Sequence, residues 1–243
     1  MNDCYVSNQE LTSLQYSNSC LSQVFFFTRN FIRNSVFFYP CGSAECANHL
    51  FNSVGVSNSF EFHNSSFIGK RTSSQQNIVK LRGSNALFQN CLFENNTAST
   101  GGVIKLTSPS SATFLNCSFI NNSAQSGGVI YGQGQVSLTI QNSVFRDNRA
   151  TKTGGVFFFT EDCKFNVTNA TFVGNESGEE GSVGHLEGVS SHSNRMNSLS
   201  LIIANSGRIE DSLPFRSSNL KSTSTLSLTL EIKTISCVRL LSI

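Results

Sequence analysis

Apolar and polar residues alternate along short segments of this chain, and the alternation returns at a constant interval. Two apolar positions, separated by one residue, recur at a period of about 26 residues. Alternation with a period of two predicts β-strands that bury one side. The first position holds Phe60, Ala86, Ala112, Leu138 and Phe165, and the second holds Phe62, Phe88, Phe114, Ile140 and Val167.

A second motif follows each alternating segment, and it pairs an Asn with a Phe three positions later. Asn tolerates a left-handed backbone and forms hydrogen-bonded stacks, so the Asn column predicts a ladder at a corner. The Phe column predicts an aromatic stack in the interior. The Asn positions are Asn64, Asn90, Asn116, Asn142 and Asn169, and the Phe positions are Phe67, Phe93, Phe119, Phe145 and Phe172.

A third motif is a pair of glycines before Val-Ile or Val-Phe, with a degraded copy at residues 181–184. Glycine accepts positive φ and lets neighbouring backbones approach closely, so each pair predicts a second fixed corner. The corner glycines are Gly101, Gly102, Gly127, Gly128, Gly154 and Gly155.

Together these columns predict an all-β fold, a parallel β-helix solenoid with coils of about 26 residues. A leucine-rich repeat is excluded because the LxxLxL pattern and any helical apolar period are missing. A propeller blade needs about 40 residues and a WD-like signature, and the chain has no Trp. Right-handedness is expected from the general preference of parallel connections.

Three regions are predicted. Residues 1–30 form an N-terminal extension or a truncated coil, and residues 31–188 form the β-helix repeats. Residues 189–243 are divergent coils, a cap, or sequence from a faulty gene prediction. Phe31–Asn34 matches the Phe-x-x-Asn motif, and Phe31 is aligned with Phe67, 36 residues later, which leaves about 10 inserted residues beyond one coil. Cys41–Cys46 falls in this interval and is interpreted as a protruding loop, closed by a disulfide or carrying two thiols.

The charged and apolar content of the chain excludes a nucleic-acid partner and a membrane span. Only 13% of the residues are charged and the net charge is +2, with the basic residues scattered along the chain. Scattered charge predicts no nucleic-acid partner. No apolar run reaches the roughly 18 residues of a membrane span. The N-terminus is expected to carry no export signal, because residues 1–5 have neither a basic nor an apolar segment.

The residues available for catalysis do not form a recognisable site. The four Asp, at positions 3, 147, 162 and 211, do not stack at the repeat period, whereas polysaccharide hydrolysis needs neighbouring carboxylates. His185 has no Ser or Cys partner at a predictable distance. Cys91 and Cys117 share a column that favours packed thiols, with a disulfide between them as the alternative in an oxidising compartment. We therefore predict no enzyme, no catalytic residue, no cofactor and no metal. The carboxylates of one rim are interpreted as solvated, with a weak cation site as the alternative: Glu94, Asp147, Glu176, Glu179 and Glu180.

Four copies of Phe-x-x-Asn alternate with Gly-Gly-Val-Ile or its variants over about residues 60–188. This arrangement resembles the repeats of the chlamydial polymorphic outer membrane proteins and of protist surface proteins, within the pectate-lyase-like β-helix superfamily. The resemblance implies a surface or secreted module for adhesion or display, with glycans or host and cell-surface proteins as partners. The missing export signal favours a fragment of a larger protein. The alternative function is a polysaccharide-active lyase or hydrolase whose site lies in other coils.

Overall fold

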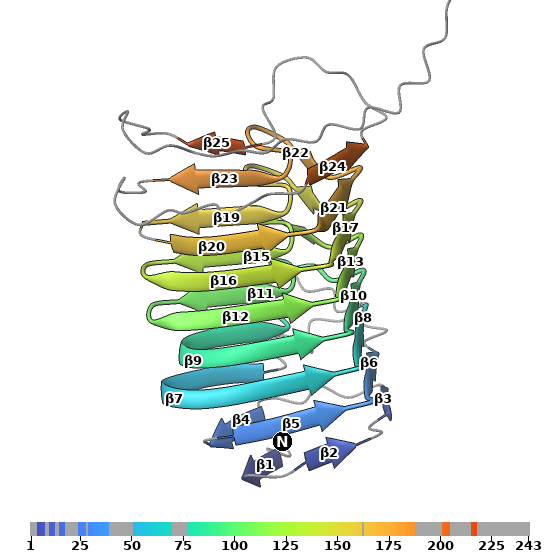
Figure 1. Ribbon diagram of the computed structural model, residues 1–243, viewed down its shortest axis with the longest axis vertical. Coiled ribbons are helices and arrows are strands. Elements are labelled where there is room, and N and C mark those ends of the chain that lie inside the picture. The colour runs from blue at the N-terminus through green and yellow to red at the C-terminus, as the bar shows by residue number, and fades with distance from the viewer. Residues whose placement is uncertain are drawn as a thin grey trace, which may run out of the picture.

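The computed structural model is a stack of parallel strands that climbs from the N-terminal to the C-terminal coils (Figure 1). It describes residues 4–7, 10–12, 15–17, 24–27, 29–38, 51–69, 77–161, 163–187, 201–204 and 215–217. Side chains are described within 31–37, 51–69, 77–161 and 163–187. The predicted Cys41–Cys46 loop lies outside these residues, as does most of 189–243.

The strands form three faces around one interior, and every pairing is parallel. The first and second faces belong to one sheet because β7 and β9 run along both. The first face contains β1 (Cys4–Ser7), β4 (Val24–Phe27), β7 (Phe51–His63), β9 (Val79–Gln89), β11 (Ile104–Thr107), β15 (Ile130–Gln133), β19 (Phe157–Thr160), β23 (Gly184–Glu187) and β25 (Phe215–Ser217).

The second face continues from the C-terminal halves of β7 and β9. Its other strands are β2 (Glu10–Thr12), β5 (Arg29–Arg33), β12 (Ser110–Leu115), β16 (Val136–Gln141) and β20 (Cys163–Thr168). The third face contains β3 (Gln15–Ser17), β6 (Val36–Phe38), β8 (Ser66–Ile68), β10 (Leu92–Glu94), β13 (Ser118–Ile120), β17 (Val144–Arg146), β21 (Ala170–Val173) and β24 (Leu201–Ala204). A short sheet joins β14 (Ser123–Ala124), β18 (Arg149–Ala150) and β22 (Glu176–Ser177).

The predicted Phe column forms a continuous stack behind the third face. The centroids of Phe93 and Phe119 are 5.0 Å apart with nearly parallel rings, and those of Phe119 and Phe145 are 4.5 Å apart. Phe88 and Phe114 form a second stack at 4.7 Å, which meets the first edge to face. Because register neighbours in a parallel sheet lie about 4.8 Å apart, identical aromatic residues stack at the spacing that offset rings favour.

The predicted alternating positions are buried throughout the described repeats. Of Phe165, only the backbone is described. The fold is thus an all-β parallel solenoid with a coil spacing of about 26 residues, as the repeat predicts.

The Gly-Gly corners are places of close backbone contact. Gly127 has a φ of +62°, which a side chain would strain. A Cβ added to Gly128 would lie 2.1 Å from the carbonyl oxygen of Gly155 in the next coil. The first glycine therefore makes the turn and the second lets successive coils approach.

The alignment of Phe31 with Phe67 is wrong. Phe31 pairs with Glu61 on the second face, and the third-face partner of Phe67 is Phe37. Phe37 is 3% exposed and stacks on Phe67 at 5.1 Å. The coil that ends at Phe67 is therefore longer than the coils that follow it, and the Phe-x-x-Asn match at Phe31 is a coincidence in a strand that buries Ile32 instead.

Candidate functional site

The outer surface of the first face carries a column of cationic and aromatic side chains. Each strand contributes the residue at one register position, from β9 through β11, β15 and β19 to β23. Because alternate residues point outward, these side chains lie opposite the buried Val79, Ile104, Ile130 and Phe157. We call this column the first-face strip; its residues are Lys80, Lys105, Tyr131, Phe158 and His185.

Rings and ammonium groups in the strip stack on one another. The Lys105 Nζ lies 5.0 Å from the centroid of the Tyr131 ring, within cation–π range. Tyr131 and Phe158 stack at 5.3 Å, and Phe158 stacks on the His185 imidazole at 5.4 Å. The stacking leaves Phe158 only 7% exposed although it points out of the solenoid. The strip is a preorganised ladder rather than a set of separate side chains.

Charge is distributed unevenly along the strip. Burial and the neighbouring charge of Lys80 lower the pKa of Lys105. Within the described part of the chain, neither lysine has a carboxylate at ion-pair distance. Burial raises the pKa of Tyr131, and the carboxylates of Glu187 and Glu161 raise it further. The strip is therefore cationic at its N-terminal end and faces carboxylates at its C-terminal end.

His185 is the last residue of the strip whose side chain the structure describes. Its Nδ1 lies 3.5 Å from Glu180 Oε2, and the residue is 7% exposed. The stacked imidazole contacts an aromatic ring rather than a hydroxyl or thiol nucleophile. This arrangement packs the imidazole against Phe158 and beside the Glu180 carboxylate.

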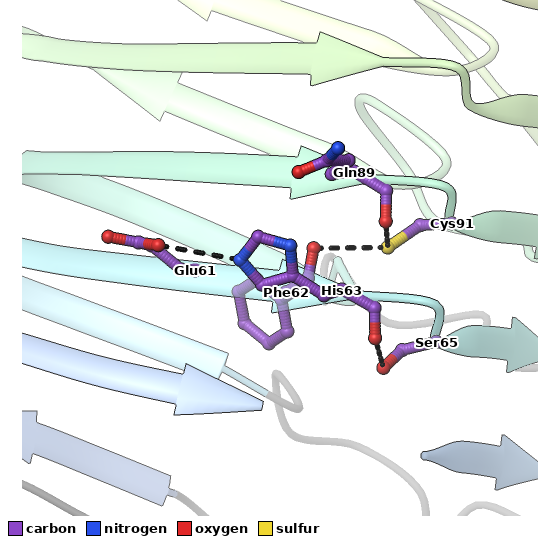
Figure 2. Close-up of polar contacts among 6 residues, drawn as sticks. All are labelled: Glu61, Phe62, His63, Ser65, Gln89 and Cys91. Atoms are coloured by element: carbon purple, nitrogen blue, oxygen red, sulfur yellow. Dashed lines mark hydrogen bonds and ion pairs between the residues drawn. The ribbon is translucent and has the colours of Figure 1, made fainter. Parts of the chain in front are cut away.

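Glu61, His63 and Ser65 lie close in sequence, yet they do not form a nucleophile, base and acid set (Figure 2). His63 Nε2 is 3.4 Å from Glu61 Oε2 on the outer surface of the second face. Ser65 lies beyond the corner, is 1% exposed, and donates its hydroxyl to the backbone oxygen of His63 at 2.8 Å. The Ser65 hydroxyl is therefore directed at the backbone and not at the His63 imidazole.

The two stacked cysteines also have structural roles. Cys91 and Cys117 are buried free thiols. The Cys91 thiol donates to the carbonyl oxygens of Phe62 and Gln89, both at 3.4 Å (Figure 2). The hydrogen bond with Cys91 and burial raise the pKa of Cys117, so that thiol stays neutral and poorly nucleophilic.

The predicted rim of carboxylates is divided among different parts of the coils. Glu94 belongs to the third face, whereas Asp147 occupies a corner with a φ of 54°. Glu176 pairs in register with Arg149 in the short sheet. Across the described residues, no three His, Cys, Asp or Glu side chains group closely enough to hold a metal ion.

The predicted Asn ladder lies on an exposed corner between the second and third faces. All five of its residues have positive φ, between 48° and 54°. The Asn90 amide donates to Asn64 Oδ1 at 2.9 Å, and the Asn169 amide donates to Asn142 Oδ1 at 2.7 Å. Asn34 extends the ladder at its N-terminal end.

A second, buried Asn ladder escaped the sequence interpretation. Asn122 Nδ2 donates to the carbonyl oxygen of Phe93 and to Asn148 Oδ1, both at 3.0 Å. Its Oδ1 accepts from the backbone N–H and the amide of Asn96, at 3.1 and 2.9 Å. These residues are the Asn of each Phe-x-x-Asn motif, so the signal was present but was used only for the family resemblance. The ladder comprises Asn96, Asn122, Asn148 and Asn175.

The first-face strip was also missed, although a signal for it exists. Lys105, Tyr131 and Phe158 each follow a Gly-Gly corner at the same offset, and His185 follows the degraded copy Gly181-Ser182 at that offset. The residues differ in type, so no repeated letter marks the column. Only the strand register shows that they contact one another.

Three faces of parallel strands, stacked aromatic columns and two Asn ladders define a parallel β-helix solenoid. The family model described as right handed beta helix region matches residues 29–201, and the chain belongs to this family. No curated protein and no solved structure matches the chain. In the described residues there is no helix with the length and apolar character to cross a membrane.

Proposed function

We propose that the chain is a non-enzymatic β-helix module of a secreted or surface protein, which binds an anionic glycan or an acidic protein segment through the first-face strip. The observation that carries the proposal is the register of Lys80 and Lys105 beside Tyr131. Two ammonium groups one coil apart repel each other, and the pKa of Lys105 is lowered first by burial and then by the charge of Lys80. A bound anion would relieve the repulsion.

The surroundings of the lysines suit an extended ligand. Arg82, Thr107 and Gln133 form the neighbouring outward column, which supplies a third cation and two hydrogen-bonding side chains. Tyr131 adds the edge of an aromatic ring. Repeated weak contacts along successive coils favour a repeating ligand, because each further contact adds at high effective concentration.

The distribution of titratable groups supports a binding role over catalysis. Within the described coils, no three His, Cys, Asp or Glu side chains gather closely enough to hold a metal ion, and the carboxylates of Glu161 and Glu187, which lie in neighbouring coils, border the first-face strip beside Tyr131. Beside the Glu61–His63 pair, Ser65 donates its hydroxyl to the backbone oxygen of His63 and not to the imidazole. Placement at the cell surface rests on the resemblance of the repeats to those of surface proteins.

Binding is tested with the purified chain on an array of neutral, carboxylated and sulfated glycans. We expect selective binding to anionic glycans that weakens as salt increases. Lys105→Ala should lower affinity at least about tenfold, since a charge-assisted contact contributes roughly 1.5–3 kcal/mol. Ser137→Ala on the second face is the matched control and should bind like the parent. Salt-independent binding, or equal loss in both variants, would contradict the strip as the site.

Catalysis is tested by incubation with pectin or alginate, with and without calcium. We expect no new reducing or unsaturated ends. Activity that disappears in Glu176→Gln or Asp147→Asn would overturn the non-enzymatic proposal and favour a polysaccharide-active enzyme.

A further inference from the structure

The outer surface of the third face is unusually apolar for a face of this solenoid. Strands β8, β10, β13, β17 and β21, stacked along the right side of Figure 1, each present two outward residues. By contrast, the outward residues of β12 and β16 on the second face are mostly Ser, Thr and Gln. The third-face residues are Ser66, Ile68, Leu92, Glu94, Ser118, Ile120, Val144, Arg146, Thr171 and Val173.

These ten residues are arranged symmetrically about β13. One coil before β13 lie Leu92 and Glu94, and one coil after it lie Val144 and Arg146 in the same two columns. Two coils away, Ser66 and Ile68 of β8 correspond to Thr171 and Val173 of β21. If the order of the coils is reversed, each apolar residue therefore takes the place of another apolar residue and Ser66 exchanges with Thr171. The acidic Glu94 and the basic Arg146 exchange places.

We propose that the third face binds the third face of a second copy of this chain, about a two-fold axis that runs parallel to the strands at β13. Such an axis reverses the order of the coils in the second copy. Each column of outward residues then faces the same column of that copy. Ile120 then faces Ile120 of the second copy, Leu92 faces Val144, and Glu94 faces Arg146 twice. An isologous interface requires this kind of self-complementarity.

The charges select this orientation over its alternative. An axis parallel to the solenoid would keep the coil order and exchange the two columns, which places Glu94 opposite Leu92 and Arg146 opposite Val144 and buries both charges without a partner. Within one chain, Glu94 and Arg146 are separated by the coil of Ile120 and so lie roughly 10 Å apart. Neither has an ion-pair partner among the described residues. The second copy supplies both missing partners.

The size of the surface sets the expected affinity. Five strands with two outward residues each span about 10 Å by 20–25 Å, on the order of 250 Å² per copy before the flanking corners are included. Stable interfaces bury about 800 Å² per partner, so a dimer of this size is weak and concentration-dependent. We expect a dissociation constant on the order of 10–100 µM, in the range of transient assemblies.

Charge reversal tests the proposal. Sedimentation equilibrium of the full chain should show a monomer–dimer equilibrium. Glu94→Arg and Arg146→Glu should each raise the dissociation constant at least about tenfold, because each replaces two attractions by two repulsions. The double variant E94R/R146E restores both pairs and should dimerise within about threefold of the parent. Arg82→Glu, on the outer surface of the first face, is the matched control and should leave dimerisation unchanged.

Cross-linking tests the position of the axis. Ile120→Cys places two thiols across the axis, so mild oxidation should give a disulfide-linked dimer faster than Thr113→Cys on the second face does. A chain that stays monomeric up to millimolar concentration, or a double variant no better than the single ones, overturns the proposal. These results do not depend on glycan binding, because the first-face strip lies on a different face.

Discussion

A single residue type, Asn, has two different roles in each coil. Asn116 sits on an exposed corner, where its positive φ matters more than its amide. Asn122 is fully buried and takes part in four hydrogen bonds through its side chain. The physical difference is solvent: water replaces the amide contacts of the first residue but cannot reach those of the second.

Asn122→Ala should lower the free energy of unfolding by about 2–4 kcal/mol, since each buried polar group that loses its partner costs about 1–3 kcal/mol. Asn116→Gly keeps the left-handed corner and should cost at most about 1 kcal/mol. Denaturant unfolding monitored by circular dichroism measures both. Equal losses would show that burial does not separate the two ladders.

Tyr131 reports on the electrostatics of the first-face strip. Its pKa lies above the ordinary value of 10.0 because of burial and the carboxylates of Glu187 and Glu161. Glu187→Gln should therefore move the phenol pKa down toward its usual value. The measurement is phenolate absorbance during alkaline titration, taken as the difference from Tyr131→Phe.

The raised pKa of Tyr131 also makes the stability of the protein depend on pH in a definite direction. A folded-state pKa above that of the unfolded chain stabilises the protein fully below about pH 10, and this contribution is lost as pH rises through the folded value. The parent should thus lose more stability than Tyr131→Phe in alkaline solution. A parallel pH dependence of the two proteins would contradict a buried phenol.

At the scale of elements, the interior depends on columns rather than on single side chains. Phe119 stacks between Phe93 and Phe145 and meets Phe114 edge to face. Phe119→Ala should destabilise the chain by about 3–5 kcal/mol, because rigid coils above and below limit collapse of the cavity. The denaturant midpoint measures the loss. Thr113→Ala, on the outer surface of the second face, should change stability by less than about 0.5 kcal/mol.

The strand columns were predictable because their period is carried by residue type. Phe, Asn and Gly recur at fixed positions of the repeat, and each needs its place for a local reason: volume, left-handed backbone or close approach. The N-terminal coil was misaligned because the coil between Phe37 and Phe67 is longer than those that follow it. The alignment relied on the Phe-x-x-Asn match at Phe31 and overlooked the alternation that buries Ile32. Burial decides the register of a strand, so the alternation was the better guide.

At the scale of the whole molecule, each coil contacts only its neighbours, so the solenoid behaves as a nearly one-dimensional array. Hydrogen exchange should be slowest in the central strands and faster toward both ends. Phe119→Ala should accelerate exchange most in β10, β13 and β17, and progressively less in coils farther away. Mass spectrometry of peptides resolves this gradient. Uniform acceleration across all coils would indicate a single cooperative unit instead.

Both proposed binding surfaces also belong to this scale, because each is built from residues of several coils. Lys80 and Lys105 lie in successive coils, and Glu94 and Arg146 are separated by a whole coil between them. In the sequence these charges are far apart, and no binding surface was predicted from them, although Glu94 was assigned to a rim of carboxylates. Stacking of the coils turns them into a cationic strip and a self-complementary face.

The sequence by itself determined the solenoid: its β class, its coil length, its aromatic interior and its two corners follow from residues whose identity repeats. Only the tertiary structure decided which outward residues become neighbours, which Asn column is buried, and where the N-terminal coil is in register. The physical reason is that buried positions demand a residue type, whereas outward positions accept almost any side chain. Their meaning comes from contacts across coils, and those contacts exist only once the strands are paired.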